Sequence, residues 1–234
     1  MNWLRSTLNR WRRRWVRALL YRIVFGERSQ GQDLPHTRIS PAACIEQEDK
    51  LVLADHVYIG PFNYLECSGG ITLGEGVQIT SHCSIVTHSS HRAARLLGEG
   101  FVRWPSSGFA ERPGWIAGPV EIGPYSFIGP HSLIEANTKL GKGTLVCAGS
   151  FVRGEYPDFV ILEGRPARVV GDSRRADRKL LQRYPEAIAQ YQQSLQQDRR
   201  QPHALLRCVQ EAVTNSVRHA RAQHITIRLS RIGE

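Results

Sequence analysis

The sequence predicts a mainly β protein that winds as a parallel β-helix, with an amphipathic helix in front of it and a helical appendage behind it. Two observations carry this prediction: a hydrophobic residue recurs every six positions through the middle of the chain, and a basic segment with an apolar stripe precedes it. With 234 residues, 41% of them hydrophobic and 22% charged, the chain has a globular composition. Its cysteines are odd in number and lack C-x-x-C spacing, so we expect neither a disulfide framework nor a cysteine-based zinc site, and a cytoplasmic location fits.

Residues 1–26 are predicted to form a basic amphipathic helix. They contain seven arginines and no acidic residue, and therefore hold most of the net charge of +10. Apolar residues recur at spacings of three and four, which places them on one helix face: Leu4, Leu8, Trp11, Trp15, Ala18 and Leu19. This pattern favours peripheral contact with an anionic inner membrane surface. Docking on the same protein or on a neighbouring subunit is the open alternative, and nucleic acid is a weaker one. We expect no signal peptide and no spanning helix.

A six-residue repeat follows residues 27–50, which we interpret as a linker and the approach to the repeat. Aliphatic residues occupy every sixth position at Ile122, Ile128, Ile134, Leu140, Val146 and Val152. Small residues follow the first five of these at a constant offset: Ser126, Ser132, Thr138, Thr144 and Ser150. The same frame occurs earlier at Leu53, Ile59 and Leu65, and again at Leu73, Ile79 and Ile85. Between the two earlier runs the frame slips by two residues near Ser68–Gly70, which predicts a bulge in one turn.

A period of six fits neither an α-helix nor a long alternating strand, but it fits a prism with short strands on flat faces. Three hexads make one coil, so the aliphatic residues stack as ladders inside and the small residues fit the corners. Residues 89–119 interrupt the period and predict a loop that leaves the prism. The spacing does not determine the hand of the coil.

Residues 51–170 resemble the hexapeptide-repeat acyltransferases, through the repeat and through two segments, Ile85–His91 (IVTHSSH) and Glu163–Val170 (EGRPARVV). The resemblance implies a left-handed β-helix that assembles as a homotrimer. It also implies transfer of an acetyl or similar acyl group from acetyl-CoA to a sugar hydroxyl, without a metal. A lipid-linked saccharide of envelope or exopolysaccharide biosynthesis is the expected kind of acceptor, but the sequence identifies neither the sugar nor the acyl chain.

The resemblance places the catalytic histidine directly after a coil, where this chain has His88. A histidine can remove the hydroxyl proton as the oxygen attacks the thioester. His91 is the alternate base. Glu66 stands where related sugar-modifying enzymes carry an asparagine that contacts the acceptor, so it either orients His88, contacts the acceptor or is solvated.

The resemblance also implies a coenzyme A site near the C-terminal end of the prism. Ala148 and Gly149 would lie against the pantetheine arm, and the charged contacts would come from Arg153, Arg165 and Arg168. In the 89–119 loop, aromatic and guanidinium groups are candidates for contacting sugar and phosphate: Arg92, Arg103, Trp104 and Trp115.

Two alternatives of other classes stay open. Carbonic anhydrases with the same prism bind zinc through three histidines, and this chain offers His82, His88, His91 and His131. A non-catalytic trimeric scaffold is the other alternative.

The C-terminal part changes character. Residues 171–200 are predicted to form a helix. Residues 201–234 resemble the N-box of sensor histidine kinases, in which Glu211 would polarise an attacking group and Asn215 would bind magnesium. The glycine-rich boxes that complete an ATP site do not follow before Glu234, so we expect a kinase-like fragment without kinase activity.

Overall fold

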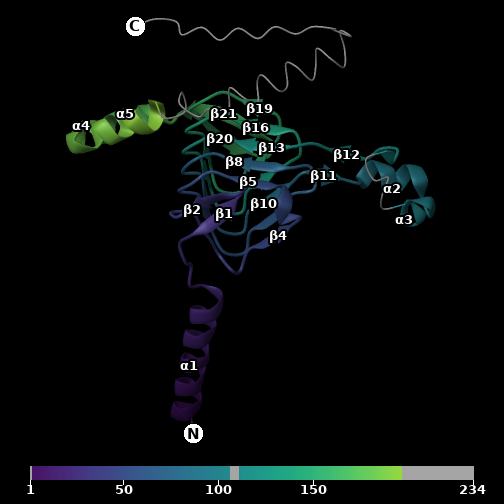
Figure 1. The fold of residues 1–234 in the computed structure, drawn as a ribbon, viewed down its shortest axis with the longest axis horizontal. Coiled ribbons are helices and arrows are strands. Elements are labelled where there is room, and N and C mark those ends of the chain that lie inside the picture. The colour runs from purple at the N-terminus through teal and green to yellow at the C-terminus, as the bar shows by residue number, and fades with distance from the viewer. Residues whose placement is uncertain (1, 106–110, 197–234) are drawn as a thin grey trace, which may run out of the picture. The chain divides into compact units, whose positions relative to one another are not determined.

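The structure is a computed structural model, and it describes residues 2–105 and 111–196. The chain divides into two compact units, residues 1–180 and residues 181–234. The first unit contains the β-helix with the helix α1 (Asn2–Leu20) (Figure 1). Residues 201–234, which carry the predicted N-box with Glu211 and Asn215, lie outside the described part of the chain.

The β-helix is a prism with three faces of short parallel strands, ordered so that neighbouring strands come from successive coils. Face 1 consists of β3 (Arg38–Ile39), β6 (Tyr58–Ile59), β9 (Gln78–Ile79), β14 (Phe127–Ile128), β17 (Leu145–Val146) and β20 (Val160–Gly164). Face 2 consists of β4 (Cys44–Glu46), β7 (Tyr64–Glu66), β10 (Ser84–Val86), β15 (Leu133–Ile134) and β18 (Phe151–Val152). Face 3 consists of β5 (Leu51–Leu53), β8 (Ile71–Leu73), β13 (Val120–Ile122), β16 (Thr138–Leu140) and β19 (Glu155–Tyr156). We call the corners edge 1/2, edge 2/3 and edge 3/1, after the faces that the chain joins there.

The predicted aliphatic ladders form the core. On face 1, Ile59 pairs with Ile79, and Ile79 with Ile128, in parallel register. In the run of six from residue 122 onward the side chains are at most 2% exposed: Ile122, Ile128, Ile134, Leu140, Val146 and Val152. Each coil thus removes apolar surface from water by stacking on its neighbours, which is the main stabilising term for such a solenoid.

The small residues of the repeat are buried at the corners, as the sequence predicts. Ser126, Ser132, Thr138, Thr144 and Ser150 are all at most 2% exposed. Their hydroxyls donate to carbonyl groups that the turns leave without a ladder partner; Ser150 Oγ, for example, lies 2.7 Å from the carbonyl oxygen of Cys147. A larger apolar residue there would displace the turn and remove this hydrogen bond.

The prism begins earlier in the chain than the predicted residue 51. Strand β3 pairs in parallel with β6, so the first coil starts at Arg38, inside the segment interpreted as linker and approach. A small antiparallel hairpin, β1 (Glu27–Ser29) with β2 (Gln32–Leu34), precedes this coil. A short 3-10 helix, η1 (Glu48–Lys50), lies at its edge 2/3. At the C-terminal end, β21 (Ala167–Asp172) pairs antiparallel with β20 and closes face 1.

Residues 171–200, predicted as one helix, contain two in the described part. These are α4 (Arg174–Arg183) and α5 (Ile188–Gln196), with a short 3-10 helix η3 (Pro185–Ala187) between them. Pro185 explains the break, because proline cannot donate the backbone hydrogen bond that would continue α4. None of the described helices has both the length and the apolar run needed to cross a bilayer.

Candidate active site

The 89–119 loop leaves the prism at edge 2/3. In the coil below, the same edge is crossed by residues 67–70, which contain the frame slip predicted as a bulge. The slip is a longer corner, and it recurs one coil earlier at residues 47–50. Gly70 has a φ of +90°, and a Cβ on Gly69 would lie 2.9 Å from the carbonyl oxygen of Gly118 and 2.9 Å from Thr87 Cβ. The corner therefore needs glycine so that the loop stem can pack against it.

The stem of the loop is a two-stranded antiparallel ribbon. Strand β11 (His88–Ser89) pairs with β12 (Ile116–Ala117), and His88 lies opposite Ala117. The amide of Gly118 donates to the carbonyl of Thr87 at 3.0 Å. Beyond the ribbon lie the short helices α2 (His91–Leu97) and α3 (Gly100–Arg103). The ribbon fixes His88 at the point where the loop joins the prism, since both ends of β11 are held by backbone hydrogen bonds.

Glu66 lies beside His88. Val86 pairs with Glu66 in the parallel ladder, so Glu66 belongs to the coil directly below the histidine. His88 Nδ1 is 2.7 Å from Glu66 Oε2 and 3.0 Å from the hydroxyl of Ser68. The Glu66 side chain is 4% exposed and that of His88 is 31% exposed, so the carboxylate is buried while the imidazole reaches the surface. Of the three roles expected for Glu66, the geometry matches that of orienting His88.

The surroundings of Glu66 keep its carboxylate ionised. Burial alone would raise the pKa, but hydrogen bonds from Ser68 and Thr87 outweigh it and lower the pKa of Glu66 from 4.5 to about 2. Oε1 accepts from the Ser68 amide at 2.8 Å, and Oε2 accepts from the Thr87 amide at 3.1 Å and the Thr87 hydroxyl at 2.8 Å. Both oxygens thus face backbone donors, and Oε2 also faces the histidine.

This pairing determines which nitrogen of His88 can act as a base. A carboxylate accepts hydrogen bonds only, so Nδ1 carries the hydrogen that faces Glu66. The lone pair of the neutral ring is then on Nε2, which is available to a substrate proton. A carboxylate in this place would also stabilise the imidazolium if Nε2 took up a proton.

Trp115 covers one face of the His88 ring. The two rings stack with centroids 4.5 Å apart and planes 17° apart. Arg112, which is buried, lies over Trp115 at 5.3 Å and over Phe101 at 4.4 Å. The loop therefore contributes an aromatic and guanidinium layer directly against the candidate base.

The other predicted loop residues lie on the two short helices of the loop or at their ends. Arg92 and Arg103 are exposed, and Arg103 lies 3.7 Å from Glu99 on its own helix turn. Trp104 is half-buried at the end of α3. His91, the alternate base, is exposed at the start of α2, and its Nδ1 lies 2.7 Å from the Ser89 hydroxyl. His91 therefore lacks the buried carboxylate that His88 has.

The residues expected to bind coenzyme A divide between two edges. Ala148 and Gly149 lie between β17 and β18, at edge 1/2. The hairpin β20–β21, which carries Arg165 and Arg168, turns at the same edge, because β20 runs parallel to β17. Both arginines are exposed. A Cβ on Gly149 would meet open space, so the backbone is accessible there.

Arg153 lies apart from this group. It follows β18 at edge 2/3, the edge of His88, and it is exposed. Because β18 pairs with β15 and β15 with β10, Arg153 stands two coils above His88 on the same edge. With about 4.8 Å between neighbouring strands, the two backbones are about 10 Å apart.

The four histidines of the zinc alternative do not gather in this chain. His82 and His131 stack on each other at edge 1/2 with ring centroids 4.9 Å apart, whereas His88 and His91 belong to the loop stem at edge 2/3. Within residues 2–105 and 111–196, the group close enough to share an ion is His36, Asp55 and His56. It contains none of the four.

Ser68 and Thr87 are the site residues that the sequence did not single out for a role. Thr87 is part of the IVTHSSH segment, and Ser68 lies in the frame slip. Both signals were present, but the hydrogen bonds to Glu66 become visible only when the two coils are aligned.

Comparisons with known proteins find relatives among acetyltransferases and a solved structure of the same fold. No family model matches the chain. A probable acetyltransferase of Mycobacterium tuberculosis is 30% identical over 123 residues, covering 53% of this chain and 37% of that protein. Galactoside O-acetyltransferase of Escherichia coli is 26% identical over 110 residues, covering 46% of this chain and 47% of that protein. The chain thus spans less than half the length of either relative.

A solved structure shows the architecture. The N-acyltransferase AntD of Bacillus cereus, in complex with dTDP and 3-hydroxybutyryl-CoA, matches with a TM-score of 0.50 and 20% identity, over 66% of this chain and 89% of AntD. The fold is a left-handed parallel β-helix. The predicted fold class is confirmed, and the hand that the repeat left open is settled.

Proposed function

We propose that this chain is a coenzyme A-dependent O-acyltransferase that moves an acetyl or similar acyl group to a sugar hydroxyl, with His88 as the general base. The observation that carries the proposal is the contact between His88 Nδ1 and the buried, ionised Glu66 at 2.7 Å. Acyl transfer to a hydroxyl needs a base near neutrality and a group that stabilises its protonated form. The similarity to acetyltransferases, among them a galactoside O-acetyltransferase, supports the acyl group and the sugar acceptor.

In this mechanism His88 takes the proton of the acceptor hydroxyl at Nε2 while the oxygen attacks the thioester carbon. Glu66 stabilises the resulting imidazolium through Nδ1. When the tetrahedral intermediate collapses, the carbon–sulfur bond breaks and His88 returns the proton to the thiolate. The products are the acylated sugar and free coenzyme A, and the base is restored.

We propose that the working form is a homotrimer. The residues expected to bind coenzyme A at edge 1/2 and the pair His88–Glu66 at edge 2/3 lie on opposite borders of face 2. Three prisms around an axis can bring edge 1/2 of one subunit against edge 2/3 of the next. Such an arrangement would place both groups in one cleft, with Trp115 and the rest of the loop stem covering it.

The test is thiol release from acetyl-CoA with a panel of glycosides, nucleotide sugars and amino sugars. His88→Ala is expected to lower acceptor-dependent release by about 10²-fold or more while coenzyme A binding by calorimetry stays unchanged. His91→Ala is the matched comparison and is expected to retain most activity. If His91→Ala lost acceptor-dependent release and His88→Ala kept it, His91 would be the base. Acylation restricted to amino sugars would replace O-transfer with N-transfer, and failure of the wild type to bind coenzyme A would overturn the proposal.

A further inference from the structure

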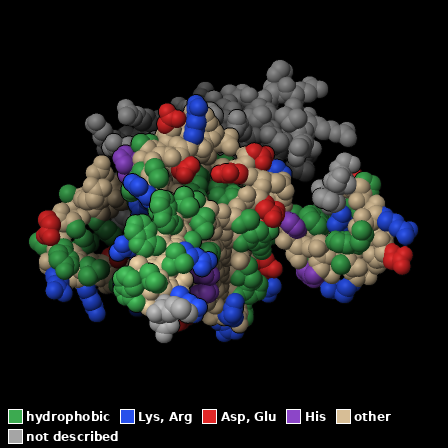
Figure 2. Space-filling view, turned by 90° about the horizontal axis from the view of Figure 1, so that it is seen from below, with side chains coloured by type: hydrophobic (Ala, Val, Ile, Leu, Met, Phe, Trp, Pro, Cys, Tyr) green, Lys and Arg blue, Asp and Glu red, His purple; other side chains and the backbone are tan. Residues whose placement is uncertain are grey.

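The helix α1 exposes a continuous apolar stripe. Residues three and four apart in a helix share a face, and at 100° per residue the stripe extends from Ala18 through Trp11 and Trp15 to Leu19. Its large side chains are exposed to water: Leu4 by 62%, Leu8 by 61%, Trp11 by 55%, Trp15 by 61% and Leu19 by 70%. Figure 2, which looks along α1 from its N-terminal end, shows hydrophobic side chains at the surface beside Lys and Arg side chains. Nothing in the described part of the chain covers this stripe.

Basic side chains border the stripe. By the same helical geometry, Arg5 and Arg12 flank it on one side and Arg14 on the other. Residues 1–26 carry seven arginines and no acid, so the helix has a strong positive charge that no acidic side chain on it offsets. This charge pattern is complementary to a negatively charged surface with an apolar interior, and it opposes pairing with a second copy of the same helix.

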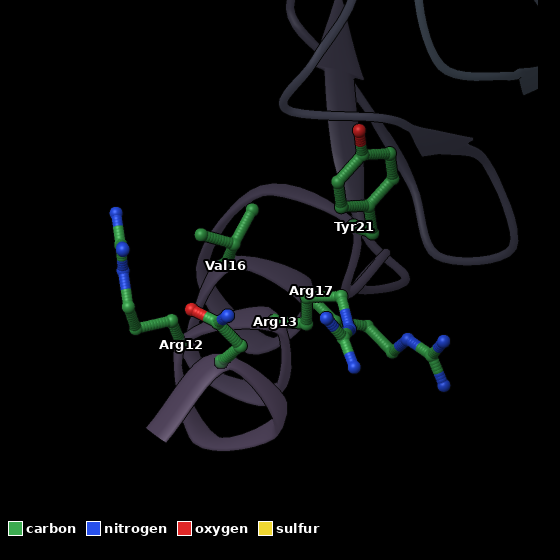
Figure 3. A pocket seen from close by; sticks show the side chains of 6 residues that line it. Arg12, Arg13, Val16, Arg17 and Tyr21 are labelled. Carbon is green, nitrogen blue, oxygen red and sulfur yellow. The ribbon is translucent and has the colours of Figure 1, made fainter. Parts of the chain in front are cut away.

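Beside the stripe, an open surface depression of about 690 Å³ is lined by Asn9, Arg12, Arg13, Val16, Arg17 and Tyr21 (Figure 3). Three of these residues carry guanidinium groups, which bind phosphate oxygens in a fork geometry, and Tyr21 adds a hydroxyl donor. None of the residues that line the depression belongs to the His88 site. The guanidinium groups of Arg12, Arg13 and Arg17 are thus available to phosphate oxygens on this side of the helix, away from the acyl-transfer site.

We propose that α1 lies in the surface of an anionic phospholipid bilayer, with the tryptophan stripe in the headgroup–acyl boundary and the arginines among the phosphates. An interfacial helix of this kind needs one apolar face, a basic opposite face and tryptophan near the boundary, and α1 has all three. The helix places the enzyme where lipid-linked molecules are presented. The proposal does not depend on the acyl-transfer activity, and its test uses no substrate.

The test is co-sedimentation of the full-length chain with vesicles of phosphatidylcholine plus phosphatidylglycerol, compared with vesicles of phosphatidylcholine alone. Trp15→Glu puts a charge into the stripe, and Ser6→Glu introduces the same side chain on the opposite, polar side of the helix. Ser6→Glu is expected to weaken partition by no more than about fivefold, the effect of one charge near an anionic surface. Trp15→Glu is expected to weaken it by at least about tenfold more, because it also removes apolar contact.

Raising the salt concentration from about 0.1 M to about 0.5 M should release the wild type from the anionic vesicles, because the arginine–phosphate attraction is screened. Equal loss with the two variants, or equal binding to both kinds of vesicle, would overturn the proposal. The proposal would also be overturned if the wild type stayed in the supernatant and the Trp15→Glu variant had a lower oligomeric mass than the wild type in sedimentation velocity. The stripe would then be a contact between copies of the chain. Thermal unfolding of both variants serves as the folding control, and it should match that of the wild type because both positions are exposed.

Discussion

Replacing Glu66 with glutamine tests the candidate site at its most constrained point. Glu66 Oε1 accepts from the Ser68 amide, whereas Oε2 accepts from the Thr87 amide and faces His88 Nδ1. A glutamine keeps the shape but turns one of these acceptors into an NH₂ donor. In one amide orientation the NH₂ group faces the Ser68 amide, and in the other it faces the Thr87 amide and the histidine. Either way one of the two backbone amides loses its acceptor, and His88 loses its negative partner.

The size of the effect follows from that contact. A hydrogen bond to a charged group contributes about 1.5–3 kcal/mol. At about 1.36 kcal/mol for each tenfold in rate, losing it from the imidazolium-like transition state lowers kcat by about 10- to 150-fold. Because Glu66 acts through His88 and is itself buried, the KM for acetyl-CoA should stay within about twofold of the wild-type value.

The assay is steady-state thiol release at a temperature below the unfolding transition of each variant. Glu121→Gln is the matched control: Glu121 Oε2 lies 3.5 Å from Lys139 Nζ, with both side chains well exposed. Exposed pairs contribute little, so this control should keep full activity. Glu66→Asp, which keeps the charge but shortens the side chain, should fall between Glu66→Gln and the wild type. Glu66 would not be the positioning residue if Glu66→Gln kept the wild-type kcat. The same conclusion would follow if the KM for acetyl-CoA rose while kcat stayed unchanged.

Three further outcomes are expected. Trp115→Ala removes the ring stacked on His88, and with about 0.5–1.5 kcal/mol at stake it should lower kcat by about 2- to 10-fold; unchanged kinetics would contradict a role for the stack. Because the pKa of Glu66 is about 2 when folded and 4.5 when unfolded, its stabilising contribution is complete above pH 4.5 and is lost as the pH falls toward 2; urea unfolding should show the wild type losing up to about 3 kcal/mol relative to Glu66→Gln over that interval. Gly69→Ala should displace the loop stem at Gly118 and reduce activity with the prism still folded by circular dichroism, whereas Gly100→Ala, where a Cβ meets open space, should be tolerated.

Much of the fold was predictable because the repeat itself defines the geometry. Once aliphatic residues stand six apart, a prism with internal ladders is the way to bury all of them, and Ile128 and Val146 lie where that reasoning puts them. The start of the prism was harder to predict from the sequence. Ile39 and Ile45 also stand six residues apart, but they are only partly buried in the first coil, and polar residues surround them.

The site was predictable in part. The position of His88 after a coil was visible in the sequence, and so was Glu66 as a candidate partner. Their contact depends on the length of one coil: Glu66 comes next to His88 because the long corner at edge 2/3 aligns it with Val86. The stacking of Trp115 on His88 could not be foreseen, because it depends on the fold of an aperiodic loop. The division of the coenzyme A candidates between two edges could not be predicted either, because it depends on which faces each corner of the chain joins.

The insertion at edge 2/3 has a consequence for how such a protein can change over time. Strand β13 pairs with β8 below and with β16 above, as though the chain between Val86 and Val120 were an ordinary corner. Closing the long excursion in place of a four-residue corner costs only about 2 kcal/mol, because loop entropy grows with the logarithm of length. The scaffold therefore tolerates exchange of the part of this segment beyond the stem strands. Under the proposed function, new acceptor preferences would arise by replacing that part while His88 and the ladders that keep the protein folded stay in place.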